Sequence, residues 1–116
     1  MMVSPYIYVG LATTKLRPRG DVFEHALSVV IADFGISRGQ LMSRRRWRYH
    51  VFARQVLSYI CRVHYGMKLT RIANLLGGRH HSTILHNIRQ HHHDDTYDAE
   101  YREVCSRIMR KVFISL

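Results

Sequence analysis

The chain has 116 residues, 47% of them hydrophobic, and its formal net charge at pH 7 is +10. This length and apolar content predict one folded domain with its own core and exclude a disordered chain. The positive charge indicates a polyanionic partner, such as nucleic acid or anionic lipid. It is concentrated between Asp33 and Asp94, where the sequence has no acidic residue and eleven basic ones: Arg38, Arg44, Arg45, Arg46, Arg48, Arg54, Arg62, Lys68, Arg71, Arg79 and Arg89.

The first twenty residues predict an irregular arm. They begin MMVSPYIYVGLATTKL, with no basic stretch at the start, and Pro5 and Gly10 interrupt the apolar residues. For this reason we do not expect a secretory signal peptide, and the apolar run is too short and too broken for a helix that spans a bilayer. We therefore expect two parts, an arm over residues 1–20 and a globular domain over residues 21–116.

Apolar residues recur at helical spacing along most of this domain, and no run alternates in the manner of a half-buried strand. Gly35 is expected to end the first helix and Ser37 to cap the second. The segment SRRRWRYH breaks the periodicity and predicts an exposed basic loop. We therefore predict an all-α domain. The first two helices are expected over residues 21–34 and from the Ser37 cap to Met42, followed by the loop over 43–50. Three further helices are expected over 51 to about 66, 68–76 and about 81–91, and a last helix begins after 95.

Two of the predicted helices form a helix-turn-helix pattern. Ala73 lies four residues before Gly77. The small alanine side chain lets the two helices approach closely, and glycine adopts the backbone angles of the turn between them. Packing alone explains Ala73 and Gly77, because helical hairpins that bind no DNA share this pattern. The segment after the turn favours DNA, since side chains suited to base edges stand at a helix N-terminus that attracts phosphate. These residues are Arg79, His80, His81, Ser82 and Thr83.

The same residues carry a resemblance to a known family. GGRHHSTILH (residues 77–86) resembles the signature GGRDHTTVLH of the C-terminal DNA-binding domain of DnaA, the bacterial chromosomal replication initiator. Upstream, LMSRRRWRYHVFARQV resembles the basic loop and long helix of that domain, and KLTRIANLLGG resembles its first helix-turn-helix helix. The likeness covers about residues 21–112. It implies a Trp-repressor-like helical fold that places a recognition helix in the major groove.

The resemblance also implies roles for individual residues. Arg46 corresponds to an arginine that enters the adjacent minor groove. His86 is expected to face the DNA backbone. Phosphate or groove-edge contacts are expected from Arg44, Arg45, Arg48, Arg54 and Arg62, and contacts at the end of the recognition helix from Arg79, His81, Ser82 and Thr83. His80, which departs from the family, is expected to contact DNA at the same helix end.

Three departures from the family pattern involve four positions. His80 stands where the signature has aspartate, so we expect a different sequence preference. Lys68 replaces a serine cap, which removes a capping box worth about 1 kcal/mol. Trp47 and Tyr49 replace small residues of the basic loop, and they either stack on sugars or anchor the loop to the core.

The nucleotide-binding module of the replication initiators is not found in the sequence. It has no GxxxxGK[ST] motif, so we expect this chain to bind no nucleotide or other cofactor and to need a partner to melt an origin. An excised domain and a natural small protein both fit, and the N-terminal arm favours the second.

Other chemistry finds weaker support. The run HHHDD (residues 91–95) offers metal ligands, but adjacent helical residues point in different directions, so a solvated helix end and no metal site are expected. Cys61 and His64 lie one turn apart, but no third group orients the imidazole, so we expect no enzyme. Cys61 and Cys105 are expected to be reduced core residues. The arginines cluster in a loop and at helix ends, which disfavours a membrane-surface helix.

The sequence thus predicts sequence-specific binding of double-stranded DNA, linked to the initiation or regulation of replication. A cytoplasmic, nucleoid-associated monomer on an asymmetric site is expected. Two alternatives stay open: a helix-turn-helix transcriptional regulator of a mobile element, and a small helical module that binds protein through its last helix.

Overall fold

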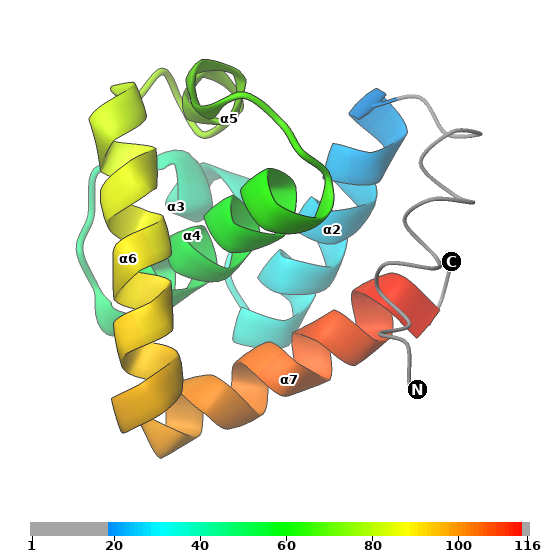
Figure 1. Cartoon of the computed structure of the whole chain (residues 1–116), viewed down its shortest axis with the longest axis vertical. Helices are drawn as coiled ribbons and strands as arrows, with labels where there is room; N and C mark the ends of the chain where they lie inside the picture. Colours follow the sequence, from blue (N-terminus) through cyan, green and yellow to red (C-terminus); the bar gives the residue numbers. More distant parts are fainter. Residues whose placement is uncertain (1–18, 115–116) are drawn as a thin grey trace.

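The computed structural model describes residues 19–114 (Figure 1). The predicted arm lies outside the described residues, apart from Arg19 and Gly20, which begin the first described helix. The elements are α2 (Arg19–Phe34), α3 (Arg38–Met42), α4 (Arg48–Tyr59), the π-helical segment η1 (Ile60–His64), α5 (Leu69–Leu75), α6 (His81–Tyr97) and α7 (Ala99–Ile114). Every element in this range is helical, so the predicted all-α class is confirmed.

Helix α4 lies at the centre, and the other long helices surround it. It packs against α2 on one side and α6 on the other, while α7 packs against both α2 and α6 (Figure 1). The central side chains are fully buried, and each contributes about 1.5–3 kcal/mol of burial. They include Leu27, Val30, Val56, Leu57, Ile60, Ile84, Tyr101 and Ile108. Cys61 and Cys105 lie in the same core as free thiols.

The residues expected to cap or end helices do so at the positions predicted from the sequence. Ser37 caps α3 in a full capping box, since its hydroxyl accepts from the Gln40 backbone and the Gln40 side chain accepts from the Ser37 N–H. Gly35 has a φ of +67° after α2, a conformation that favours glycine. Lys68 occupies the N-cap of α5 without a side-chain cap hydrogen bond, in line with the predicted loss.

Two predicted boundaries are wrong. Helix α4 begins at Arg48, so the irregular loop ends at Trp47, and His50 is buried because it faces the core. Helix α6 runs through the acidic pair to Tyr97 and does not end near His91. The reason is tertiary: α6 packs along α4, and Asp94 accepts a hydrogen bond from the Gln55 amide at 2.9 Å.

The long central helix also changes type near its end. Over Ile60–His64 its hydrogen bonds are those of a π-helix, and the Tyr65 N–H donates to the Ile60 carbonyl. The helix predicted over residues 51 to about 66 corresponds to α4 and η1 together, but the spacing of apolar residues does not separate an α-turn from a π-turn.

Candidate nucleic-acid interface

The segment Ser43–Trp47, here called the basic loop, lies against the turn of the helix-turn-helix. That turn joins α5 to α6 through Gly77, whose φ is +95°. A Cβ at Gly77 would come within 2.9 Å of the Met42 carbonyl oxygen, so the close approach of the chain at Met42 requires glycine there. Segments far apart in sequence therefore meet at one place.

Arg54 connects α4 to the basic loop. It is 5% exposed, and its guanidinium donates to backbone carbonyls at every nitrogen. Nε donates to Leu41 at 2.8 Å, Nη1 to Arg45 at 2.7 Å and Nη2 to Ser43 at 2.7 Å. The resemblance implied a contact between Arg54 and DNA, and the structure places its head group inside the fold of the loop.

Arg79 makes the matching connection from the helix-turn-helix side. Its Nε donates to the Leu76 carbonyl at 2.9 Å, and its Nη2 donates to the carbonyls of Met42, at 3.3 Å, and Ser43. The Ser43 carbonyl therefore accepts from both arginines. Within the part of the chain that the structure describes, Arg54 and Arg79 bond to no carboxylate, so neither charge is cancelled.

The uncancelled charges are close enough to affect one another. Burial, together with the nearby charges of Arg79, Arg46 and Arg44, lowers the pKa of Arg54 to about 10. Burial first, and then Arg44 and Arg46, also lowers the pKa of Arg79. Both groups stay charged at neutral pH. The result is a positive region with neutral partners, which suits a polyanion.

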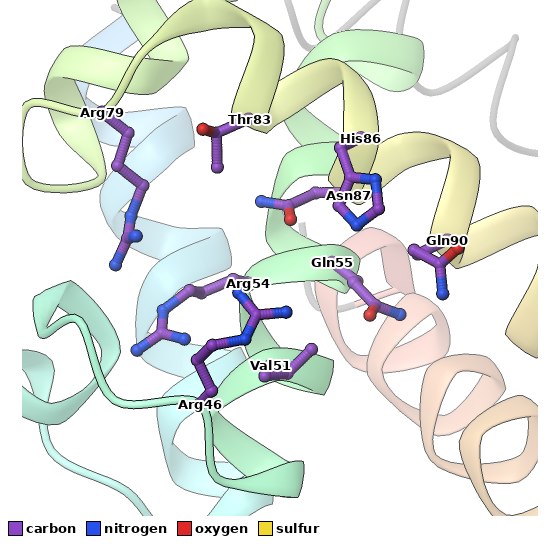
Figure 2. Close-up of a pocket in the computed structure, with 9 residues that line it drawn as sticks. All are labelled: Arg46, Val51, Arg54, Gln55, Arg79, Thr83, His86, Asn87 and Gln90. Carbon is purple, nitrogen blue, oxygen red and sulfur yellow. The ribbon is translucent and has the colours of Figure 1, made fainter.

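A cavity of about 80 Å³ opens in this region (Figure 2). Figure 2 shows side chains from the basic loop, α4 and α6 around it. Its lining includes five residues of the predicted site: Arg46, Arg54, Arg79, Thr83 and His86. The rest of the lining was not predicted from the sequence: Val51, Gln55, Asn87 and Gln90. The spacing of Thr83, His86, Asn87 and Gln90 along one helix face was a signal that could have found two of them.

The N-terminus of α6 is exposed and capped by His80. The His80 Nδ1 accepts from the Ser82 backbone N–H at 3.1 Å and lies 2.7 Å from the Ser82 hydroxyl. The His81 ring packs against His80 with ring centroids 4.3 Å apart. Because Nδ1 accepts this cap bond, the ring proton of neutral His80 belongs on Nε2. His80 therefore presents a donor where an aspartate would present acceptors.

The outer part of the basic loop is exposed and aromatic. Trp47 is 59% exposed and stacks on His50, and the Arg45 guanidinium lies 4.7 Å from the Trp47 ring centroid. Tyr49 donates to Glu100 at 3.0 Å. The sequence left two roles open for these aromatics, stacking on DNA sugars or anchoring the loop to the core. The described contacts of Tyr49 are those of an anchor. Trp47 makes one stacking contact within the protein and remains largely exposed.

Two arginines of the predicted site lie apart from this region. Arg48 forms ion pairs with Asp98 and Glu100, and its guanidinium sits 5.2 Å from the Phe52 ring centroid. Arg62, within η1, donates to the Met67 carbonyl at 3.0 Å. The described contacts thus bring Arg44, Arg46, Arg54, Arg79, Thr83 and His86 into one region, the Arg45 carbonyl accepts from Arg54 there, and His80, His81 and Ser82 stand at the N-terminus of α6, whereas Arg48 and Arg62 bond elsewhere.

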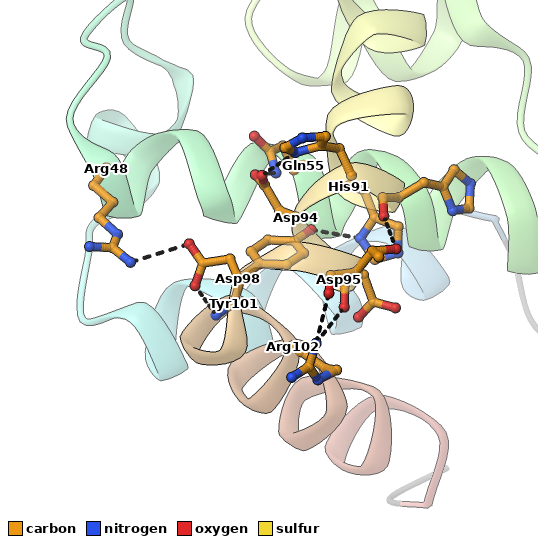
Figure 3. Close-up of polar contacts among 11 residues, drawn as sticks. Arg48, Gln55, His91, Asp94, Asp95, Asp98, Tyr101 and Arg102 are labelled. Atoms are coloured by element: carbon orange, nitrogen blue, oxygen red, sulfur yellow. Dashed lines mark hydrogen bonds and ion pairs between the residues drawn. The ribbon is translucent and has the colours of Figure 1, made fainter.

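The C-terminal half of α6 carries a different network, shown in Figure 3. In this network the guanidinium of Arg48 is paired with the carboxylate of Asp98. Asp98 also caps α7, because its side chain accepts a hydrogen bond from the Tyr101 N–H. The expected solvated helix end is wrong for His91, which is 4% exposed and lies 2.6 Å from the Tyr101 hydroxyl. Burial lowers the pKa of His91 to about 4.

Four alternatives raised by the sequence concern metal binding, catalysis, membranes and protein binding through the last helix. Within residues 22–114, no group of three or more His, Cys, Asp or Glu side chains is arranged to hold a metal ion. Burial raises the pKa of Cys61 to about 12, so its thiol keeps its proton. None of the described helices has the length and apolar character needed to cross a membrane. The apolar face of α7 is packed into the core.

Taken together, the helices and this region are those of a helix-turn-helix domain. A family model described as "Bacterial dnaA protein helix-turn-helix" matches residues 23–90, which is more than half of the chain, and the chain belongs to that family. The match ends inside α6, whereas the resemblance noted from the sequence extended through α7.

Curated relatives agree with this assignment. The chain is 33% identical over 96 residues to the chromosomal replication initiator protein DnaA of Chloroflexus aggregans, covering 83% of this chain and 20% of the relative. It is 32% identical over 106 residues to that of Herpetosiphon aurantiacus, covering 89% and 22%. It is 29% identical to that of Lachnoclostridium phytofermentans, covering 74% and 19%. The chain thus spans about a fifth of the length of these relatives.

Proposed function

We propose that this chain binds double-stranded DNA in a sequence-specific manner and takes part in the initiation of replication or in its control. In this proposal the N-terminal end of α6 enters the major groove, and the basic loop reaches the adjacent minor groove. The chain acts as a monomer on an asymmetric site, in the cytoplasm and on the nucleoid. It needs no cofactor and catalyses no reaction.

One observation carries the proposal. The basic loop, which carries Arg44, Arg45 and Arg46, is bonded to α4 through Arg54 and to the turn before α6 through Arg79, and buried Arg54 and half-buried Arg79 keep their charge because they bond to carbonyls. A surface with this much uncompensated charge is stabilised when phosphates approach and counterions leave the DNA. The family membership supports the same conclusion, since the relatives are named replication initiators.

Individual residues then take separate roles. Arg46 is the proposed minor-groove contact, and His81, Ser82 and Thr83 are the proposed base or phosphate contacts at the helix end. His86 faces the phosphate backbone from the next turn of α6. Arg45 and Trp47 extend the same side of the molecule toward the flanking backbone.

The test is the salt dependence of duplex binding, followed by the selection of sites from random duplexes. If five to seven phosphates are neutralised, the slope of log K against log salt is roughly −4 to −6. A selected site without twofold symmetry would support binding as a monomer. A slope near zero, or no duplex binding at low salt, would contradict the proposal.

A further inference from the structure

The guanidiniums of Arg54 and Arg79 both donate to main-chain carbonyls of one short segment. Arg54 donates from α4 to carbonyls of residues 41, 43 and 45, and Arg79 donates from the turn before α6 to carbonyls of residues 42 and 43. A further bond from Arg54, at 3.3 Å, reaches the Gln40 carbonyl. The two side chains thus hold the end of α3 and the start of the basic loop from two different elements, α4 and the turn before α6.

We infer that Arg54 and Arg79 are positioning residues that lock the basic loop onto the helix-turn-helix, so that Arg44–Arg46 and the N-terminus of α6 meet DNA as one preformed surface. The inference rests on the proposed function for its DNA part. Its structural part, the locking of the loop, stands by itself. It assigns to Arg54 and Arg79 a role different from the direct contact with DNA that the family resemblance implies.

The choice of arginine follows from the geometry of the bonds. Carbonyls of residues 41, 43 and 45 point at three different nitrogens of one planar group, and lysine has a single nitrogen that cannot reach all three. Carbonyl acceptors also satisfy the guanidinium without cancelling its charge. A carboxylate in the same place would hold the loop and remove the positive potential that attracts DNA.

The loop needs such a lock because its own sequence opposes order. Three consecutive arginines repel one another, and within the described residues the loop belongs to neither α3 nor α4. A free loop would lose conformational entropy on binding and so weaken the complex. Fixing it before DNA arrives removes that cost. The close approach of Gly77 to Met42 holds the same junction from the backbone side.

The first experiment uses the protein without DNA. Arg54→Lys and Arg79→Lys keep the positive charge but replace the guanidinium, with its several nitrogen donors, by a single ammonium. Arg71→Lys, on the exposed face of α5, is the matched control. We expect hydrogen exchange of the amides of residues 43–47 and trypsin cleavage after Arg44, Arg45 and Arg46 to become about ten-fold faster or more in the first two variants. Exchange of the Val56 and Leu57 amides reports global unfolding and separates it from loop opening.

Arg79 is only half-buried, so Arg79→Lys keeps the inference testable if Arg54→Lys does not fold. Faster exchange confined to residues 43–47 supports the lock. Unchanged loop protection in the folded lysine variants overturns it, whatever these variants do on DNA.

The second experiment uses the selected duplex. A lock predicts that both lysine variants lose specific affinity by about ten-fold or more, while the salt slope stays within about 0.5 of the unmodified protein because no phosphate contact is lost. Direct phosphate contact predicts the reverse: lysine keeps most of the affinity, and Arg54→Gln lowers the slope by about 1. That second pattern overturns the positioning role. If the unmodified chain binds no duplex, the proposed function fails, and the exchange data alone decide the lock.

Discussion

Near the N-terminal end of α6 the arginines are satisfied by backbone carbonyls, whereas near its C-terminal end an arginine is paired with carboxylates. Arg54 and Arg79 donate to the loop after α3, and their described partners include no acidic group (Figure 2). Arg48 instead binds Asp98 and Glu100, and its contact with Asp98 is drawn in Figure 3. One helix therefore has a charged end and a neutralised end.

The difference shows how one residue type serves two purposes. An arginine paired with a carboxylate contributes little to the external field, and an exposed pair of this kind is worth about 0–1 kcal/mol. An arginine held by neutral dipoles retains its full charge, and it can orient a loop while doing so. The position of the acidic residues along the chain, at the two ends and absent from residues 34–93, produces this division.

The strongest effect is expected from a change in the backbone of the charged end. Gly77→Val adds a β-branched side chain at a φ of +95° and within reach of the Met42 carbonyl, so we expect a loss of about 3 kcal/mol or more in the free energy of unfolding. Denaturant unfolding measures it. Gly78→Val is the matched control, because Gly78 has a φ of +75° but no atom within 4 Å of its added Cβ. Equal losses in both variants would show that the approach to Met42 does not matter.

The next effect concerns the neutralised end and its buried histidine. Burial lowers the pKa of His91 from 6.5 to about 4, so the unfolded chain takes up a proton that the folded chain does not. We therefore expect the free energy of unfolding to fall as the pH decreases from about 7 to about 4, with up to about 3 kcal/mol due to His91. Asp94 and Asp95, on the same helix, oppose this shift, while His64 and His92 add to it.

The measurement is the free energy of unfolding across that pH range for His91→Gln, with His92→Gln at the exposed neighbouring position as the control. His91→Gln is expected to flatten the acid dependence even though it loses the bond with Tyr101 at neutral pH. His50 and His64, whose pKa burial also lowers, leave some acid sensitivity in the variant. An unchanged slope in His91→Gln would place the acid-sensitive group elsewhere.

A smaller effect separates two exposed arginines that look alike in the sequence. Arg46 lines the cavity at the charged end, and Arg48 is paired with Asp98 and Glu100 at the other. We expect Arg46→Ala to weaken specific binding by about 1–3 kcal/mol, with a helical content and thermal midpoint close to those of the unmodified protein. Arg48→Ala is expected to weaken binding by less than about 1 kcal/mol. Duplex titrations measure both, and a larger effect at Arg48 would reverse the proposed division of charge.

The weakest effect is expected at the cap of α6. His80 accepts at Nδ1 from Ser82, so its Nε2–H is a donor and favours purine acceptor edges over the amino group of cytosine. His80→Asp keeps a cap acceptor and offers acceptors to the groove, so selected sites should gain cytosine at one position while stability changes by less than about 1 kcal/mol. His80→Ser, which keeps the cap without a ring, is the control. Identical site profiles for all three proteins would confine His80 to its capping role.

The all-α class, most of the helices and the family could be predicted from the amino-acid sequence. These features depend on residues a few positions apart: helical spacing of apolar side chains, the Ser37 capping box, and glycines at Gly35 and Gly77 where the chain turns. The basic character of residues 34–93 and the signature GGRHHSTILH are likewise properties of neighbouring residues in the chain. Local rules are sufficient for such features because their physical causes are local.

The partner of each arginine and the extent of α6 depend on the tertiary structure. Arg79 bonds to a carbonyl 37 positions away, and Arg48 bonds to a carboxylate 50 positions away, and no local pattern distinguishes these partners from phosphate. His91 lies in a polar run, HHHDD, yet packing against Tyr59 and Tyr101 buries it and carries the helix past the acidic pair. Burial and pairing are set by which helices meet, and that is a property of the whole fold.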